Sequence, residues 1–324
     1  MRTLSRAIAV LLACAASIGV ATAQPRYPDR PIHVIIPWPA GGIADVVLRA
    51  MQDPLQKALG QPIIIENKAG AGGTIGDDTV AKAAPDGYTL LFTSSALNMN
   101  VALGRKLPYN AVRDFVPVVN VASAPMILVA YPGLGVKTVN ELVALAKSKP
   151  GKLTFASAGN GSPAHFTAEM FLAATGIKVV HIPYRGSPQA MIDQIAGRVD
   201  FHFANSVAAI PQVNSGKVVA LAVTSDKRLK VAPSIPTMAE AGIPDFHASQ
   251  WEAFLAPRGT PQAIVDRIAK VVDQVLAQPK VIAALEPFAI EVDGKSTPKS
   301  FAVLMKSDRA MWIKVAKEAN IKAE

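Results

Sequence analysis

The stretch IPWPAGGIADVVLR, from Ile36 to Arg49, joins an apolar run to an amphipathic segment through a turn with two prolines and a glycine pair. Beyond the turn, apolar side chains recur at every fourth position, at Val47, Met51, Leu55 and Leu59. This spacing predicts an α-helix with one apolar face, and Gly60 follows as a stop signal. The stretch therefore predicts a buried strand that leads through an open turn into a helix.

The same alternation continues along the chain. Short runs rich in apolar and β-branched residues alternate with helical patterns, which is typical of an α/β fold with a mostly parallel sheet. The runs are IHVII at Ile32, PIIIE at Pro62, YTLLFT at Tyr88, KLTFAS at Lys152, KVVHIP at Lys178, RVDFHF at Arg198 and VVALAVTS at Val218. Two helix starts show a capping residue before proline, Ser162-Pro163 and Ser187-Pro188. The helices that follow are expected to stop at Gly176 and Gly197.

The length of the chain predicts two lobes. It has 324 residues, half of them apolar, which is enough for two hydrophobic cores. No repeat, low-complexity tract or polar linker separates two halves, so we expect the chain to cross between lobes more than once. The apolar segments 118–130 and 218–225 are the candidate crossing strands. The predicted division is a discontinuous lobe 1, residues 24–124 plus 236–324, and a lobe 2, residues 125–235.

The first residues resemble a secretory signal peptide. Two arginines precede an uncharged apolar run, and the sequence ATA at residues 21–23 supplies a small-x-small cleavage site. The apolar run is shorter than the ~20 residues that a membrane-spanning helix needs. We predict that residues 1–23 are removed by cleavage after Ala23 and that the protein is exported to the periplasm. Lipid anchoring at Cys14 is the less favoured alternative, because the apolar run before it is very short.

The composition of the remaining chain restricts its chemistry. It contains no cysteine, so disulfides and thiol catalysis are excluded there. Removal of Arg2 and Arg6 lowers the 33 Lys and Arg to 31, against 24 Asp and Glu, a formal charge of +7. A basic exported protein suggests small anionic ligands or an anionic membrane surface before nucleic acid, for which the sequence shows no motif. An ordinary solvated surface explains the excess charge equally well.

The loops after the predicted strands share a composition. In an open parallel sheet, ligands bind beyond the carboxyl ends of the strands, where loops lead into helices. Gly, Ser and Asn are concentrated there, in PWPAGGIAD at Pro37, NKAGAGGT at Asn67, SSALN at Ser94, SAGNGSPAH at Ser157, PYRGSP at Pro183 and ANS at Ala204. Ordinary turn chemistry is the simpler explanation for any one loop. The repetition favours a binding site, because glycines let backbone N–H groups approach a ligand and helix N-termini attract a carboxylate.

Catalytic and cofactor sites are poorly supported. The segment GAGGTIG at Gly70 resembles a dinucleotide fingerprint, but Ile75 occupies the third glycine position, and we expect no cofactor. The five histidines include no i, i+4 pair, and we predict no metal site. The sequence has no G-x-S-x-G motif. A hydrolase built from Ser162 and His165 is the remaining catalytic alternative, although no orienting acid is evident.

A carboxylate in these loops is expected to be held without a salt bridge, since no loop offers a clustered pair of arginines. Helix N-termini bind anions without a formal charge, and bridging water is nearly as favourable as a direct bond. The predicted donors are the backbone N–H groups of Gly41, Gly42 and Gly159, the hydroxyls of Ser157 and Ser162, and bridging waters. Asp45 has two interpretations, a first-turn acid that complements the helix dipole or a residue that orders the ligand loop.

A series of motifs carries a family resemblance. They are PWPAGGIADVVLR, ENKAGAGGTIG, AAPDGYTLL, KLPYNAVRDFVPV, SAGNGSPAHFTAEMF, HIPYRGSPQAMIDQIAGRVD, GKVVALAVTS, PSIPTMAEAGIP and WEAFLAPRGTP. With them the sequence closely resembles the Bug family, the extracytoplasmic solute receptors of tripartite tricarboxylate transporters. The resemblance implies a two-lobed, type II-like Venus flytrap with two crossover strands. It also implies that a small carboxylate binds between the PWPAGG loop and the SAGNGS and PYRG loops.

The resemblance also assigns positions in the site. Trp38 fills the aromatic place after Pro37, residues 40–42 form a backbone cradle, and Asp45 is the acid. Together with the other loops, the candidate ligand-binding residues are Trp38, Ala40, Gly41, Gly42, Asp45, Ser94, Ser95, Ser157, Ala158, Gly159, Ser162, His165, Tyr184, Arg185 and Asn205.

Two positions depart from the family pattern. Ala204 stands where an acidic residue often precedes Asn205, and Val101 replaces a proline often found after Asn100. The missing acid removes a partner for a ligand amino group, so we expect simple mono- or dicarboxylates, including aromatic ones, rather than amino acids. The predicted function is a periplasmic, monomeric solute receptor without catalytic activity that delivers its ligand to membrane transporter subunits. The alternatives are an exported hydrolase and a non-transport sensor that presents its liganded form to a membrane partner.

Overall fold

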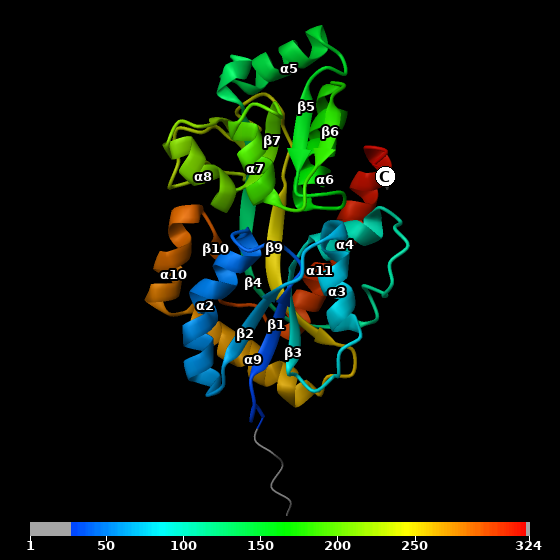
Figure 1. The fold of residues 1–324 in the computed structure, drawn as a ribbon, viewed down its shortest axis with the longest axis vertical. Coiled ribbons are helices and arrows are strands. Elements are labelled where there is room, and N and C mark those ends of the chain that lie inside the picture. Colours follow the sequence, from blue (N-terminus) through cyan, green and yellow to red (C-terminus); the bar gives the residue numbers. More distant parts are fainter. Residues whose placement is uncertain (1–26, 322–324) are drawn as a thin grey trace, which may run out of the picture.

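The computed structural model describes residues 27–321. The predicted signal peptide, its cleavage after Ala23 and the alternative anchor at Cys14 fall outside these residues. The strands are β1 Ile32–Ile36, β2 Ile63–Asn67, β3 Thr89–Ser94, β4 Phe115–Ala130, β5 Thr154–Ser157, β6 Val180–Pro183, β7 Phe201–Asn205, β8 Val219–Val223, β9 Ser249–Pro257 and β10 Glu291–Val292. The helices are α2 Ile43–Leu59, α3 Thr74–Ala81, α4 Ala96–Ala102, α5 Val139–Ser148, α6 Pro163–Thr175, α7 Ser187–Ile195, α8 Ser206–Asn214, α9 Gln262–Leu276, α10 Pro279–Leu285 and α11 Pro298–Glu318. Figure 1 shows two lobes, with α2, α3, α9, α10 and α11 in lobe 1 and α5 to α8 in lobe 2.

The two lobes share one sheet, with the order β2-β1-β3-β9-β4-β7-β5-β6 and with β8 and β10 paired to β4 beside this path. Strand β1 is parallel to β2 and β3, and β5 is parallel to β6 and β7. Strand β9 is antiparallel to β3 and β4, and β4 is antiparallel to β7. The prediction of a mostly parallel sheet is right for the outer strands and wrong for the centre. The reason is that β9 carries the chain back from lobe 2 to lobe 1 and is antiparallel to both of its neighbours, β3 and β4.

Strand β4 crosses between the lobes. Residues 115–125 pair with β9 in lobe 1, and residues 126–130 pair with β7 in lobe 2, which confirms the crossing predicted at 118–130. The second predicted crossing, 218–225, is wrong. This segment forms the five-residue strand β8, which pairs with the lobe 2 end of β4 and with none of the lobe 1 strands described. The chain enters lobe 1 through β9 instead, whose first residue, Ser249, pairs with Pro125.

Residues 236–248 pack with lobe 2. Met238 and Phe246 are buried in the same core as Leu128 and Phe203. The hydroxyl of Thr224, just after β8, donates to the backbone carbonyl of Ala248 and ties the two ends of this segment together. This packing favours a return to lobe 1 near the start of β9, later than the residue 236 that was predicted.

The helix predicted by the opening stretch is α2. Its apolar face is fully buried, and each such side chain contributes ~1.5–3 kcal/mol of stabilisation. The left-handed Gly60 ends it by donating its N–H to the Gln56 carbonyl at 2.9 Å. Helix α6 also begins at its predicted cap, Ser162, and ends at Gly176. Helix α7 begins one residue earlier than predicted, because Gly186 is its N-cap and Ser187 is already helical.

The lobes touch outside the sheet as well. The Arg105 guanidinium of lobe 1 donates to the Asn160 carbonyl of lobe 2 at 3.2 Å. Phe166 on α6 and Trp312 on α11 pack edge to face, with ring centroids 5.5 Å apart, in an apolar cluster that contains residues of both lobes. Within residues 27–321, no helix combines the length and the apolar character that a bilayer crossing requires.

Candidate functional site

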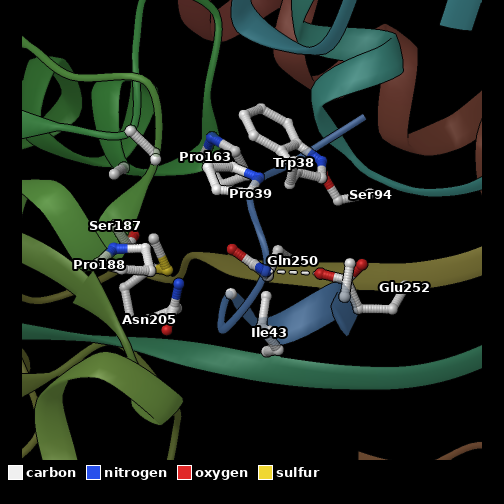
Figure 2. A pocket seen from close by; sticks show the side chains of 16 residues that line it. Trp38, Pro39, Ile43, Ser94, Pro163, Ser187, Pro188, Asn205, Gln250 and Glu252 are labelled. Carbon is white, nitrogen blue, oxygen red and sulfur yellow. Dashed lines mark hydrogen bonds between the residues drawn. The ribbon is translucent and has the colours of Figure 1, made fainter. Parts of the chain in front are cut away.

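A pocket lies where the two lobes meet the central strands. It encloses about 410 Å³ of space, part of it open to solvent, which is a common size for a small-molecule site. Figure 2 shows the lining side chains converging from the turn before α2, from the loops of lobe 2 and from strand β9. They are Trp38, Pro39, Gly42, Ile43, Ala44, Ser94, Met126, Ala158, Pro163, Ala164, Gly186, Ser187, Pro188, Asn205, Gln250 and Glu252.

Four helices begin at this pocket. Gly42 is the N-cap of α2, Gly186 is the N-cap of α7 and Asn205 is the N-cap of α8, while Pro163 is the first residue of α6. The first N–H groups of a helix have no intrahelical partner, and the helix dipole adds a partial positive charge there. Helix α2 belongs to lobe 1 and helices α6, α7 and α8 belong to lobe 2, and all four N-termini line one cavity. The cavity is therefore suited to an anion.

Asp45 orders the turn that opens the site. Its carboxylate Oδ2 accepts the Gly41 N–H at 3.0 Å and the Arg49 Nε–H at 2.9 Å. Burial opposes ionisation of Asp45, but the hydrogen bonds from Arg49 and Gly41 outweigh it and lower the pKa of the carboxyl. Gly41 has φ +78°, a left-handed conformation that favours glycine. Of the two interpretations, the geometry matches loop ordering, and Asp45 does not line the pocket.

The lining contains one ionisable side chain, Glu252. It is 1% exposed and lies on β9, where it pairs in register with Ser94 of β3. Its Oε1 accepts a hydrogen bond from Gln250 Nε2 at 2.7 Å, as Figure 2 shows. Its Oε2 has no hydrogen-bond partner among residues 27–321, and neither does the buried indole N–H of Trp38. Burial raises the pKa of Glu252 to about 8, and the bond from Gln250 offsets only part of this effect.

Three predicted residues line a different cavity. Gly159, Tyr184 and Arg185 surround a second space between the lobes, together with Gly70, Ala71, Gly72, Arg105, Asn160 and Pro183. Arg105 donates there to the Asn100 side chain at 2.9 Å and to backbone carbonyls of both lobes. The arginines therefore lie in the second cavity, and the lining of the first contains no Lys, Arg or His.

The serine and histidine candidates have structural partners. Ser162 Oγ caps α6 by accepting the His165 backbone N–H at 3.3 Å. Ser157 Oγ lies 2.7 Å from His181 Nε2 and accepts the Gly159 N–H at 3.0 Å. Burial, followed by the nearby His181 and Arg105, lowers the pKa of His165 to about 3. None of Ser157, Ser162 and His165 lines the pocket, which argues against the hydrolase built from Ser162 and His165.

The structure thus divides the predicted site residues into three groups. Those that line the pocket are Trp38, Gly42, Ser94, Ala158 and Asn205. Those that line the second cavity are Gly159, Tyr184 and Arg185. Those that line neither are Ala40, Gly41, Asp45, Ser95, Ser157, Ser162 and His165. No group of three or more metal-ligating side chains occurs in the part of the chain that the structure describes.

The contribution of β9 to the pocket was not predicted from the sequence. Gln250 and Glu252 are polar residues at alternate positions of the otherwise apolar run SQWEAFLAP, so both face the same side of the sheet. That alternation was the available signal. Met126, at the point where β4 passes from one lobe to the other, was not predicted either, nor were the prolines Pro39, Pro163 and Pro188.

Comparison with known proteins identifies the family. The model of the tripartite tricarboxylate transporter family receptor, TctC, matches residues 47–321. Protein BugT of Bordetella pertussis (strain Tohama I) is 37% identical over 325 residues, which cover 98% of this chain and 99% of BugT. The structure of the periplasmic binding protein BugD has a TM-score of 0.88 and 33% identity over 92% of this chain and 100% of that chain. The structure of R. palustris Rpa4515 with adipate has a TM-score of 0.88 and 32% identity over 91% and 99%.

These matches cover both lobes and confirm the resemblance to the Bug family that the motifs predicted. The chain belongs to the tripartite tricarboxylate transporter receptor family.

Proposed function

We propose that this protein is a periplasmic receptor without catalytic activity that binds a small organic carboxylate between its lobes and delivers it to a tripartite tricarboxylate-type transporter. The observation that carries the proposal is the convergence of four helix N-termini on a pocket whose lining contains no basic side chain. A similar protein was solved with adipate, a dicarboxylate. We further propose that lobe 1 consists of residues 27–124 and 249–321 of the described chain, and that the receptor is a monomer.

A thermal-shift screen of organic acids tests the proposal. A ligand that binds only the folded form raises stability by RT ln(1 + [L]/Kd), or ~2.7 kcal/mol at a hundredfold excess over Kd. We expect one or more mono- or dicarboxylates to raise the melting temperature, and their amides to have no effect. A panel without any stabilising acid would contradict the proposal.

The alternatives give different results. A hydrolase would turn over esters or amides, and sustained turnover that Ser162→Ala abolishes would overturn the receptor function. A sensor would bind the same acids without supporting uptake.

The loops around Arg105 and Asn160 touch in this structure, so the two lobes are close together. We expect small-angle scattering to show a liganded form as compact as this structure and a ligand-free form with a larger radius of gyration.

A further inference from the structure

Glu252 is a buried acid that the site must accommodate. Its Oε1 accepts a hydrogen bond from Gln250, and its Oε2 is buried beside the pocket that Glu252 lines, without a partner among residues 27–321. An ionised carboxylate in this position would be an uncompensated buried charge, which proteins avoid by pairing the group or by protonating it. The protonation state of Glu252 therefore depends on the charges that surround its carboxyl group.

The elements that line the pocket offer no cation to Glu252. Strands β3, β4 and β9 contain no other ionisable side chain, and neither do α4 and α8. On α2, the charges nearest the N-terminus are Asp45 and Arg49, which bond to each other. On α6, burial keeps His165 neutral. On α7, the nearest charge is Asp193, which is bonded to Arg198 and Tyr184.

The solute is also unsuited to supply a cation. The four helix N-termini place partial positive charges around the cavity, so they attract a carboxylate and repel an ammonium group. A carboxylate that enters the pocket adds a second negative charge near Glu252. Like charges in a shared site raise the pKa of the acid, so solute binding and protonation of Glu252 favour each other.

The register of the sheet separates two polar ends of the pocket. Along β4, Asn205 pairs with Met126 and Glu252 pairs with Ala122, four residues apart, which corresponds to ~13 Å between the two positions. Figure 2 shows Asn205 with Ser187 on one side and Glu252 with Ser94 on the other, with Ile43 and the Gln250 amide between them. Two polar ends at this separation match a short carbon chain with an oxygen-bearing group at each end, and the Gln250 amide between them is bonded to Glu252.

Resting on the proposed function, we propose that the solute is a dicarboxylate and that Glu252 binds it as a neutral carboxylic acid, with the Oε2–H donating a hydrogen bond to one of its carboxylates. One carboxylate lies at the N-termini of α7 and α8, and the other lies between the N-terminus of α2 and Glu252. Each solute is thus bound together with one proton on the protein. The raised pKa of Glu252, about 8, means that this proton is largely in place before the solute arrives at neutral pH.

Calorimetry between pH 6 and pH 10 tests this proposal with succinate, malate, adipate, hexanoate and aspartate as probes. We expect a dicarboxylate to bind most tightly, and its affinity to fall roughly tenfold for each pH unit above pH 8, because ionised Glu252 must first take up a proton. Titration at pH 9 in two buffers with different ionisation enthalpies should show uptake of about one proton. The pH slope should disappear in Glu252→Gln and persist in Glu291→Gln, which changes an exposed acid on β10.

Other outcomes overturn the proposal separately from the function on which it rests. Affinity that rises with pH, with aspartate as the best probe, would show an ionised Glu252 paired with an ammonium group. A pH slope that Glu252→Gln retains, or binding without proton uptake at pH 9, would remove Glu252 from the binding reaction while the receptor function stands. If none of the acids binds the wild-type protein even at pH 6, the receptor function and this proposal both fail.

Discussion

Two cavities lie between the lobes, and their linings have opposite chemistry. The first combines four helix N-termini with one buried acid and contains no basic side chain. The second contains Arg105 and Arg185 beside glycine-rich loops. Arg105 uses its guanidinium to bond loops of both lobes, which makes it part of the contact between them. On the proposed function, formal positive charge is a poor guide to the anion site of this protein, because helix N-termini supply the donors.

The strongest test of this comparison is Gly42→Val. Gly42 has φ −78°, which valine tolerates, but its side chain would enter the pocket and separate the solute from the α2 N-terminus, and the added Cβ would lie 3.3 Å from the Pro39 carbonyl oxygen. We expect calorimetry to show affinity lowered at least about a hundredfold, or ~2.7 kcal/mol. Gly294→Val is the matched control, since a Cβ there meets open space. Normal binding by Gly42→Val would show that the α2 N-terminus in the first cavity does not bind the solute.

The next test uses the stability of Glu252→Gln without solute. The folded pKa is about 8 and the ordinary value is 4.5, so below pH 4.5 the acid is protonated in both states and has no effect. Between pH 4.5 and pH 8 the unfolded chain releases the proton and the folded chain keeps it, so wild-type stability falls as pH rises. Glutamine does not titrate, so we expect the stability of Glu252→Gln relative to wild type to rise by about 3 to 4 kcal/mol between pH 5 and pH 8. Denaturant unfolding at both pH values measures the gain, and equal pH profiles for the two proteins would contradict it.

A smaller effect is expected for Asp45→Asn. The amide offers a single acceptor in place of a charged carboxylate, so the bonds from the Gly41 N–H and the Arg49 Nε–H weaken and the turn loses order. We expect affinity for the best carboxylate to fall about tenfold, or ~1.4 kcal/mol. Asp53→Asn, at an exposed position of the same helix, should bind like wild type. An unchanged affinity in Asp45→Asn would show that the turn needs no such support.

The smallest effect is expected for Arg185→Ala, which changes the second cavity only. Affinity should stay within about threefold of wild type, or ~0.7 kcal/mol, because the guanidinium does not line the first cavity. Calorimetry could instead show that Arg185→Ala loses several kcal/mol of binding free energy while Gly42→Val binds normally. The anion would then be held by charge in the second cavity and not by helix N-termini in the first.

The parts of the site that could be predicted from sequence are those with local signals. Glycine pairs, a serine before proline and an asparagine after a strand specify turns and caps within a few residues, so Gly42, Pro163 and Asn205 fall in loops that were identified. The fold class followed from the alternation of strands and helices and from the family motifs. These patterns need no knowledge of which strands pair.

The parts that could not be predicted depend on pairing across long distances. Nothing in the apolar run around Glu252 indicates that it inserts between β3 and β4, so its position beside Ser94 appears only in the sheet. Arg185 was predicted as a ligand-binding residue from its loop, but this loop borders both cavities, with Arg185 at the second and residues 186–188 at the first. The second crossing was misplaced for the same reason, since β8 and β9 are both apolar and only their pairing distinguishes them.

The central place of β9 has a consequence for the synthesis of the chain. Strands β3 and β4 are complete by residue 130, but the strand that joins them in lobe 1 begins at Ser249. Until about 120 more residues have been made, both strands have unpaired edges, which are the surfaces through which nascent chains aggregate. Lobe 2 can form its sheet as a nearly continuous segment, whereas lobe 1 must wait for its central strand. A chain truncated before β9 should therefore be recovered as aggregates, however well its first half is formed.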